Sequence, residues 1–198
     1  MLPAPWLRDL AGAWTFYTVL PGAEWLKPRF ERIARFAPWI GLFIGCIQSG
    51  IWILLNNSNW PKISSALIII SVEAIITGGL HLDGLIDTAD GLAAGKKRRA
   101  KAMKDSSAGA IGVISLLIVV LIQVSCLIKL GPLVPLTFPI IGFWSRFSPL
   151  WAIKKFNYIN ESGNSSFHRK YLQGLGDLIP AIFGLFSLII VLALISHG

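Results

Sequence analysis

Three aspartates are spaced so that a helix would place their carboxylates on one side. Asp83, Asp87 and Asp90 follow one another at intervals of four and three residues. At about 100° per residue, they fall within roughly 60° of one another around a helix. Three carboxylates this close repel one another, and at the end of an apolar stretch the repulsion is poorly screened, so the spacing favours a bound cation. Oxygen ligands are typical of Mg²⁺ or Mn²⁺ sites rather than zinc sites.

A solvated acidic helix start would explain the same three aspartates without a metal. We favour the metal because the segment directly follows an apolar stretch and because apolar residues are interleaved with the acids. These apolar residues are Leu82, Leu85, Ile86 and Leu92. We therefore expect the opposite side of the helix to be buried and the acidic stripe to line a site.

Two more ionisable residues precede the stripe. Glu73 lies in an apolar stretch, where a carboxyl group is costly and is either functional or a protonated acid hydrogen-bonded between helices. A straight helix would separate Glu73 from Asp83 by about 15 Å, too far to share an ion, but a break at Gly78-Gly79 would shorten this distance. His81 is either a metal ligand or proton acceptor, or an interfacial side chain.

Candidate phosphate-binding residues follow the stripe. Asp105-Ser106-Ser107 is placed to begin an apolar helix, where Asp105 serves as the N-cap, as a site residue or as both. The free amides of that helix form an anion site, and Gly109 and Gly112 would let a phosphate or a neighbouring helix approach closely. Arg146, within another apolar stretch, needs a partner such as a substrate phosphate or an aspartate. This combination predicts phosphoryl transfer, in which the protein positions substrates and neutralises charge.

The elements that must position these residues are apolar stretches of membrane-spanning length. The 198 residues are 54% hydrophobic and only 14% charged, too apolar for a water-soluble domain. The stretches of about the 20 residues that a bilayer requires are 38–55, 63–80, 107–130, 133–153 and 176–196. We therefore expect an all-α, polytopic integral membrane bundle of about five transmembrane helices, with residues 1–198 forming a single catalytic domain. An N-terminal interfacial helix would carry aromatic residues at headgroup level: Trp6, Trp14, Phe16 and Tyr17.

Basic residues gather on alternate sides of these stretches, which predicts the orientation of the chain. They precede the first stretch and follow the second and the fourth: Arg8, Lys27, Arg29, Arg32 and Arg35; Lys96, Lys97, Arg98, Arg99, Lys101 and Lys104; Lys154, Lys155, Arg169 and Lys170. The positive-inside rule puts these segments, and with them the acidic site, on the cytoplasmic side of the inner membrane. The net charge of +8 then reflects topology and attraction to anionic membrane lipid, so no nucleic-acid partner is expected. The cluster at 96–104 could also attract an anionic substrate.

The acidic segment resembles a known family signature. Residues 77–91, Thr-Gly-Gly-Leu-His-Leu-Asp-Gly-Leu-Ile-Asp-Thr-Ala-Asp-Gly, are similar to the signature of the cobalamin synthase family, the adenosylcobinamide-GDP ribazoletransferases. Residues 36–45, 103–113 and 144–146 extend the resemblance in the same order along most of the chain.

The resemblance implies a Mg²⁺-dependent membrane enzyme that joins adenosylcobinamide-GDP, a nucleotide-activated corrinoid, to α-ribazole or its 5′-phosphate and releases GMP. This reaction is the late nucleotide-loop assembly step of cobalamin biosynthesis. The implied Mg²⁺ ligands are Asp83, Asp87 and Asp90. Further implied site members are Glu73, His81 and Asp105 near the reacting groups and Arg146, Ser106, Ser107 and Lys104 toward substrate.

The chain departs from this family in two places. The usual Thr-Arg-Ile-Pro is replaced by Thr18-Val19-Leu20-Pro21, so any role of that arginine is absent. The carboxyl end is also shorter than usual, by what would be a final span, and a homo-oligomer could supply the missing surface.

Other functions fit an acidic helix in a membrane. Polyprenyl transferases and CDP-alcohol phosphotransferases are also Mg²⁺-dependent, but the latter carry Asp-Gly-x-x-Ala-Arg, and residues 83–88 lack the arginine. A membrane cation transporter with Glu73 and Asp83 on its ion path would instead show metal flux without turnover.

Overall fold

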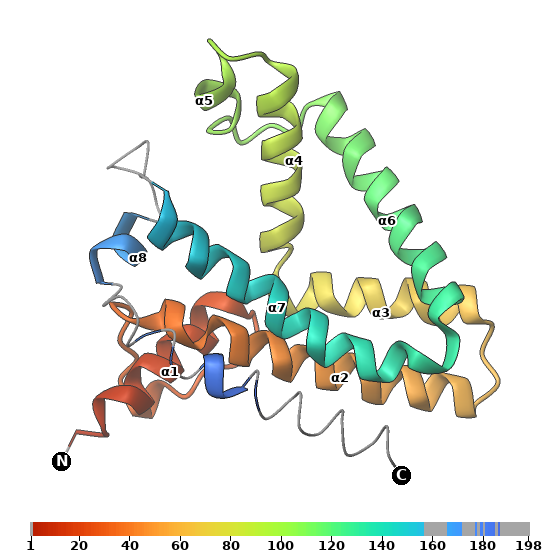
Figure 1. Cartoon of the computed structure of the whole chain (residues 1–198), viewed down its shortest axis with the longest axis horizontal. Helices are drawn as coiled ribbons and strands as arrows, with labels where there is room; N and C mark the ends of the chain where they lie inside the picture. Colours follow the sequence, from red (N-terminus) through yellow and green to blue (C-terminus); the bar gives the residue numbers. More distant parts are fainter. Residues whose placement is uncertain are drawn as a thin grey trace. The chain divides into compact units, whose positions relative to one another are not determined.

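Helices are the only regular elements in the computed structural model, which describes residues 2–156, 166–171, 177, 179, 181–184 and 186 (Figure 1). The α-helices are α1 (Pro5–Tyr17), α2 (Ala37–Asn57), α3 (Lys62–Thr77), α4 (Leu80–Ala93), α5 (Arg99–Ala102), α6 (Ala110–Leu130), α7 (Val134–Lys155) and α8 (Ser166–Tyr171). Short 3₁₀ turns are η1 (Glu24–Leu26), η2 (Ile33–Phe36) and η3 (Gly131–Leu133). The all-α prediction is therefore confirmed for the described residues.

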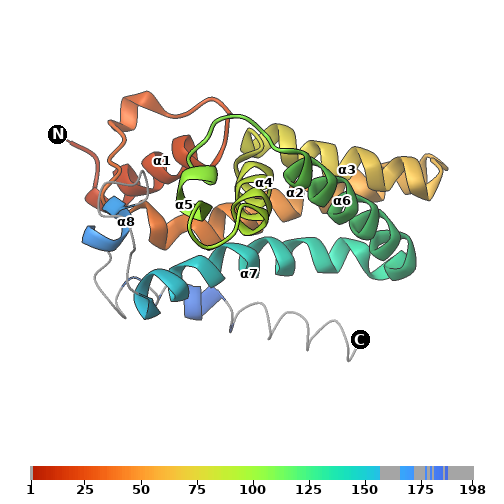
Figure 2. The same ribbon diagram turned by 90° about the horizontal axis from the view of Figure 1, so that it is seen from above.

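The chain divides into two compact units. One comprises Met1–Ser49 and Leu136–Gly198, and the other comprises Gly50–Pro135. In the second unit, α6 begins beside the end of α4, as Figures 1 and 2 show. In the first unit, α1 packs on η2. The expectation that residues 1–198 form one catalytic domain stays a prediction.

Among the residues that the structure describes, two helical stretches are long and apolar enough to cross a membrane, Ile33–Asn57 and Ala110–Lys155. Helices α3 and α4 would add a third span if they are taken together as one broken span. The predicted spans 107–130 and 133–153 fall within one of these stretches, and the predicted span 176–196 lies largely outside the described residues. The structure therefore shows two or three candidate spans, and the five expected from the sequence are not shown.

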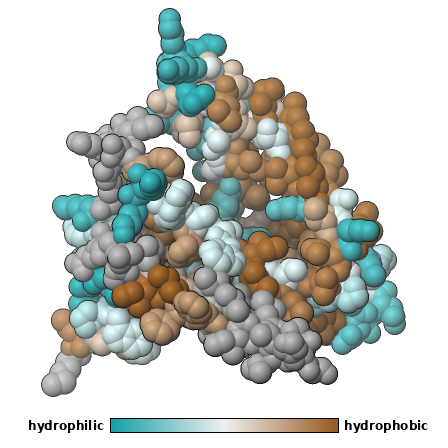
Figure 3. Space-filling model, in the orientation of Figure 1, coloured by the Kyte–Doolittle hydropathy of each residue, from teal (hydrophilic) through white to brown (hydrophobic). Residues whose placement is uncertain are grey.

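The surface of α6 is strongly apolar. Hydrophobic side chains cover its visible face in Figure 3. Over the whole helix, the exposed large hydrophobic residues are Ile111, Val113, Ile114, Leu117, Ile118, Leu121, Ile122 and Ile128. An apolar surface of this length is stable in contact with lipid and unfavourable in water. A membrane location for α6 follows from its surface as well as from its composition.

A pair of glycines ends α3 and starts α4. Gly78 and Gly79 have φ angles of 62° and 74°, in the left-handed region where glycine has no steric penalty. The axes of α3 and α4 differ by 93° across this pair. The helix break anticipated at Gly78-Gly79 is thus present, and the predicted continuous span over 63–80 ends at Thr77.

Glycines also let α2 and α7 approach closely in the first unit. A Cβ atom at Gly41 would lie 1.9 Å from the carbonyl oxygen of Gly142, and one at Gly142 would lie 2.2 Å from the carbonyl oxygen of Gly41. Small residues at a helix crossing allow such backbone contact, a common way to pack membrane helices. The same Gly41 leaves room for the side chain of Arg146, whose Cδ would be 2.7 Å from that Cβ.

Candidate functional site

Helix α4 carries the three aspartates on one side, as their spacing predicts. Asp83 is exposed, while Asp87 and Asp90 are partly buried. Of the apolar residues expected to be buried, Leu82, Leu85 and Ile86 are partly buried, but Leu92 is 58% exposed. The prediction that Leu92 belongs to a buried side is therefore wrong, because α4 is covered by α6 along only part of its circumference.

Asp90 holds the beginning of α6. Its Oδ2 accepts a hydrogen bond from the backbone N–H of Gly109 at 2.7 Å, and its Oδ1 accepts one from the N–H of Gly112, also at 2.7 Å. The first amides of a helix lack partners within the helix, so a carboxylate there satisfies them and also interacts favourably with the helix dipole. Asp90 is thus the cap of α6, supplied from another helix.

The start of α6 differs from the sequence-based expectation. The helix begins at Ala110 with Gly109 at the N-cap position, so Asp105 does not cap it. Asp105 Oδ1 instead accepts hydrogen bonds from the backbone N–H of Ser107 at 3.0 Å and from its hydroxyl at 2.6 Å. These hydrogen bonds lower the pKa of Asp105 from its ordinary value. Of the two groups that Gly109 and Gly112 were expected to admit, the structure shows the neighbouring helix: α4 lies there, and Asp90 accepts hydrogen bonds from the N–H groups of both glycines.

The donor chemistry of the stripe suits Mg²⁺ held by few protein ligands. Within the described part of the chain, no three His, Cys, Asp or Glu side chains converge as a ready metal cage. Asp83 and Asp87 are four residues apart on α4, which brings their Cβ atoms to about 5–6 Å. Mg²⁺ commonly binds to one or two carboxylates and completes its shell with water and substrate phosphates. Asp90 already accepts two hydrogen bonds from backbone N–H groups, so fewer of its oxygen lone pairs are left for a metal ion. Its role as a third ligand stays a prediction.

The break at Gly78-Gly79 brings Glu73 and His81 to one pocket. This pocket, of about 90 Å³, lies in the second unit and is lined by Ile70, Glu73, Ala74, Thr77, His81, Leu82 and Gln123. Its volume would hold about three water molecules. Gln123, from α6, was not anticipated from the sequence, because a single amide within an apolar helix gives no positional signal. Its position places an uncharged donor and acceptor beside two ionisable groups.

The other candidate substrate residues are dispersed. Lys104, Ser106 and Ser107 lie exposed in the segment between α5 and α6. Arg146 belongs to the first unit, where it is 3% exposed and its Nη1 donates to the Gly142 carbonyl at 3.3 Å. The expectation that these residues bind substrate stays a prediction.

A cluster of ion pairs around Asp9 was missed by the sequence analysis. Asp9 is fully buried and accepts hydrogen bonds from Arg29, Nε to Oδ1 at 2.6 Å and Nη2 to Oδ2 at 3.0 Å, and from Arg35 Nη2 to Oδ2 at 2.6 Å. Arg32 pairs with Asp177. The sequence analysis interpreted these arginines only as signals of membrane topology. Asp9 lies 20 residues before Arg29, its nearest partner, and a single acid at that distance gives little indication of such pairing.

Comparison with known proteins shows a family match over nearly the whole chain. The family model described as cobalamin-5-phosphate synthase matches residues 9–197. A relative from Prochlorococcus marinus strain MIT 9303, named adenosylcobinamide-GDP ribazoletransferase, is 54% identical over 96% of this chain and 74% of its own length. Proteins of the same name from P. marinus strain MIT 9313 and Trichormus variabilis are 56% and 33% identical, each over 89% of this chain and over 68% and 70% of their own lengths. No solved structure matches significantly.

Proposed function

The chain belongs to the cobalamin-5-phosphate synthase family, and from this premise we propose that it is a Mg²⁺-dependent adenosylcobinamide-GDP ribazoletransferase of cobalamin biosynthesis. The observation that carries the proposal is the arrangement of α4. Residues 80–91 of the segment that resembles the family signature lie on one helix, on which Asp83 and Asp87 share a side while Asp90 secures α6.

Asp83 and Asp87 are the residues that would hold Mg²⁺. When bound, the ion would neutralise the diphosphate of adenosylcobinamide-GDP and the charge that develops on the departing GMP. Asp90 contributes indirectly, because its bonds to Gly109 and Gly112 hold α4 in one rotational position against α6. Arg146, Lys104, Ser106 and Ser107 would contribute further charge and hydrogen bonds to the phosphates.

The reaction needs a proton acceptor for the attacking alcohol. A ribose hydroxyl of α-ribazole, or of its 5′-phosphate, attacks the phosphorus nearer cobinamide, forming a new P–O bond as the bond to the GMP oxygen breaks. The hydroxyl proton must leave as this bond forms. His81 and Glu73 line one pocket next to the helix that carries the metal ligands, so His81 is our candidate acceptor and Glu73 the candidate group that orients it or receives the proton.

We place the enzyme in the inner membrane with its acidic site toward the cytoplasm. The apolar surface of α6 and the lysines and arginines at 96–104 support this orientation. We further propose that the chain crosses the membrane five times, contacts membrane lipid and assembles as a homo-oligomer. A cysteine introduced at position 97 should react with an impermeant reagent only from the cytoplasmic side.

The deciding experiment measures GMP released from adenosylcobinamide-GDP, α-ribazole 5′-phosphate and Mg²⁺ by the purified protein. Asp83→Asn and Asp87→Asn should each reduce turnover by about 100-fold or more and raise the Mg²⁺ concentration needed for half-maximal rate. Glu24→Gln, which alters an exposed acid on η1, is the matched control and should retain full turnover. Absence of GMP with folded wild-type protein, or full turnover by Asp83→Asn, would refute the mechanism.

A further inference from the structure

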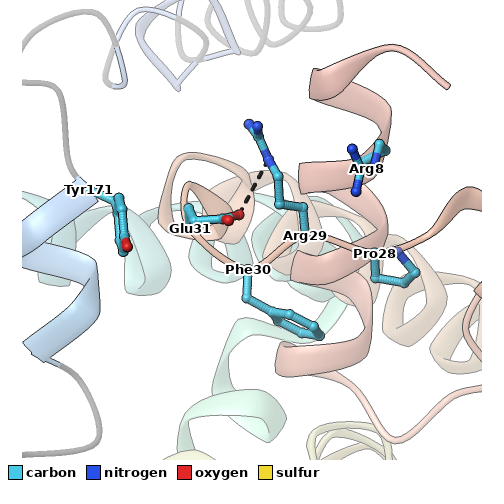
Figure 4. Close-up of a pocket in the computed structure, with 6 residues that line it drawn as sticks. All are labelled: Arg8, Pro28, Arg29, Phe30, Glu31 and Tyr171. Carbon is cyan, nitrogen blue, oxygen red and sulfur yellow. Dashed lines mark ion pairs between the residues drawn. The ribbon is translucent and has the colours of Figure 1, made fainter. Parts of the chain in front are cut away.

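A second pocket lies in the unit that contains the N-terminal helix. It has a volume of about 450 Å³ and is lined by Arg8, Pro28, Arg29, Phe30, Glu31 and Tyr171 (Figure 4). Arg8 comes from α1, Tyr171 from α8, and the remaining residues from the segment before η2. In Figure 4, Arg8 and Tyr171 lie on opposite sides of Phe30 and Glu31. No residue of this pocket has a part in the transferase mechanism proposed above.

Arg8 differs from the other arginines of the N-terminal cluster. Arg29 and Arg35 are bonded to Asp9, and Arg32 is paired with Asp177. Arg8 has no carboxylate partner among the described residues. Its charge in the pocket is therefore uncompensated, whereas the neighbouring guanidinium groups are neutralised by acids of the chain.

Two hydrogen bonds fix the position of Arg8. Its Nε donates to the Lys27 carbonyl at 3.0 Å, and the backbone N–H of Arg29 donates to the Arg8 carbonyl at 3.0 Å, so both ends of the residue are anchored. In the described structure its two Nη groups donate to no acceptor of the chain. A guanidinium whose plane is fixed loses little side-chain entropy when its remaining N–H groups bind the oxygens of a phosphate.

Other charges around the pocket do not cancel Arg8. Glu31 also lines the pocket and forms an ion pair with Arg29 rather than with Arg8: its Oε2 lies 3.3 Å from Arg29 Nε (Figure 4), although this oxygen accepts no hydrogen bond among the described residues. The Lys170 ammonium does not line the pocket, but it lies 5.3 Å from the centroid of the Tyr171 ring and so places a second positive charge nearby. The Tyr171 hydroxyl is a further potential donor. We propose that this pocket binds a phosphate group, with Arg8 as its principal ligand.

The surroundings suggest a phospholipid as one source of the phosphate. Trp6 precedes Arg8 by half a helical turn and is 54% exposed, and Trp25 on η1 is 77% exposed. Exposed tryptophans are typical of segments that lie at lipid headgroup level. A soluble phosphate ester would make the same contacts to Arg8, so the experiment has one arm for each source.

The experiment uses native mass spectrometry of the full chain purified in detergent. Phosphatidylglycerol, diacylglycerol and sn-glycerol 3-phosphate are added separately, so that the phosphate and the acyl chains are tested independently. We expect phosphatidylglycerol to bind, and Arg8→Gln to weaken that binding by about 10-fold or more. Binding of glycerol 3-phosphate with the same dependence on Arg8 would identify a soluble anion as the ligand and would equally support the site.

Two variants control for charge and folding. Lys27→Gln removes one positive charge from the residue whose backbone carbonyl accepts the Arg8 hydrogen bond, but its side chain does not line the pocket, so binding should change less than about 2-fold. Arg8→Lys keeps the charge and loses the planar fork, so it should bind phosphatidylglycerol with intermediate affinity. This variant tests the site if Arg8→Gln fails to fold. Equal binding of diacylglycerol and phosphatidylglycerol, binding of neither phosphate compound, or equal losses in Arg8→Gln and Lys27→Gln would overturn the proposal.

Discussion

Asp90 and Gly109 are joined by a hydrogen bond of 2.7 Å from the backbone N–H at the N-cap of α6 to a carboxylate oxygen at the end of α4. The second oxygen of Asp90 accepts the N–H of Gly112 at the same distance. One side chain thus links two helices that are separated in the chain by the basic segment at 96–104. Both oxygens of Asp90 thus serve the contact between α4 and α6, while the roles of Asp83, Asp87 and Asp90 as cation ligands stay predictions.

Asp90→Ala should lower the free energy of unfolding by about 2 kcal/mol or more, because it leaves two buried amides of α6 without an acceptor. Asp90→Asn keeps one carbonyl oxygen and should lose about half as much. Asp87→Asn is the matched control and should change stability by less than about 0.5 kcal/mol while still reducing turnover. Unfolding in mixed micelles, followed by circular dichroism during titration with dodecyl sulfate, measures all three. Equal stability of the Asp90 and Asp87 variants would show that the cap contributes little.

Gly112→Ala should also destabilise the contact between α4 and α6. A Cβ atom there would lie 2.5 Å from Asp90 Oδ2 and 2.6 Å from Ile86 Cγ2, so the helices must separate. The expected loss is about 1–3 kcal/mol, as for other overpacked positions. Gly84→Ala on α4 meets nothing within 4 Å and should be neutral or stabilising by roughly 0.5–1 kcal/mol. The same micelle titration distinguishes them, and a Gly112→Ala protein as stable as wild type would contradict the close packing.

Local features of the sequence predicted α4 and its neighbours more reliably than the contacts made at long range. Residue spacing was enough to place Asp83, Asp87 and Asp90 on one side of a helix, and two successive glycines were enough to anticipate the break before it. Asp105 was a candidate for the cap of α6, as well as for a site residue, because that acid precedes the apolar stretch. The true cap, Asp90, lies 19 residues before Gly109, and nothing in a linear pattern specifies which distant carboxylate reaches a helix end.

Charge patterns had a similar limit. Arg29, Arg32 and Arg35 were counted as cytoplasmic positive charge, a reading that membrane topology alone would justify. Their partners are Asp9 and Asp177, at separations of 20 to 145 residues, which only the folded chain reveals. Composition can locate a cluster of charge, whereas pairing depends on how helices from distant parts of the sequence pack.

Replacing Gly79 tests whether the bend between α3 and α4 serves catalysis. Gly79 has room for a Cβ atom, but its φ angle of 74° is unfavourable for alanine. Gly79→Ala should therefore lower the free energy of unfolding by about 1–2 kcal/mol, unless the backbone relaxes and the bend between α3 and α4 straightens. Straightening would separate Glu73 from His81, and GMP release should fall by about 10-fold or more. Gly79→Asn, which tolerates the left-handed region better, should retain more activity. Gly50→Ala, on α2 with nothing within 4 Å, should behave as wild type in both assays.

His168 should make the protein sensitive to mild acid. Burial lowers its pKa from 6.5 to about 4, and its ring contacts Phe16 edge-on at 5.6 Å between centroids. Between these two values the unfolded chain binds a proton that the folded chain does not, so stability should fall as the pH drops from about 6.5 to 4. Thermal unfolding of His168→Gln across this range should show a smaller pH dependence than wild type. Identical slopes would mean that His168 ionises equally in both states.

Asp9→Asn should be among the most destabilising single substitutions in the N-terminal unit. The carboxylate is 0% exposed and bonds to two guanidinium groups, those of Arg29 and Arg35. Removing its charge leaves the largely buried Arg35 without its ion-pair partner and leaves Arg29 with Glu31 only, at an expected cost of about 3 kcal/mol. Glu24→Gln, at an exposed acid of the same unit, should change stability by less than about 0.5 kcal/mol. Because Asp9 joins α1 to the segment at 29–35, proteolysis of Asp9→Asn should cut first near that segment. Uniform resistance to protease, with an unfolding transition equal to that of Glu24→Gln, would show that Asp9 is not what holds α1 in place.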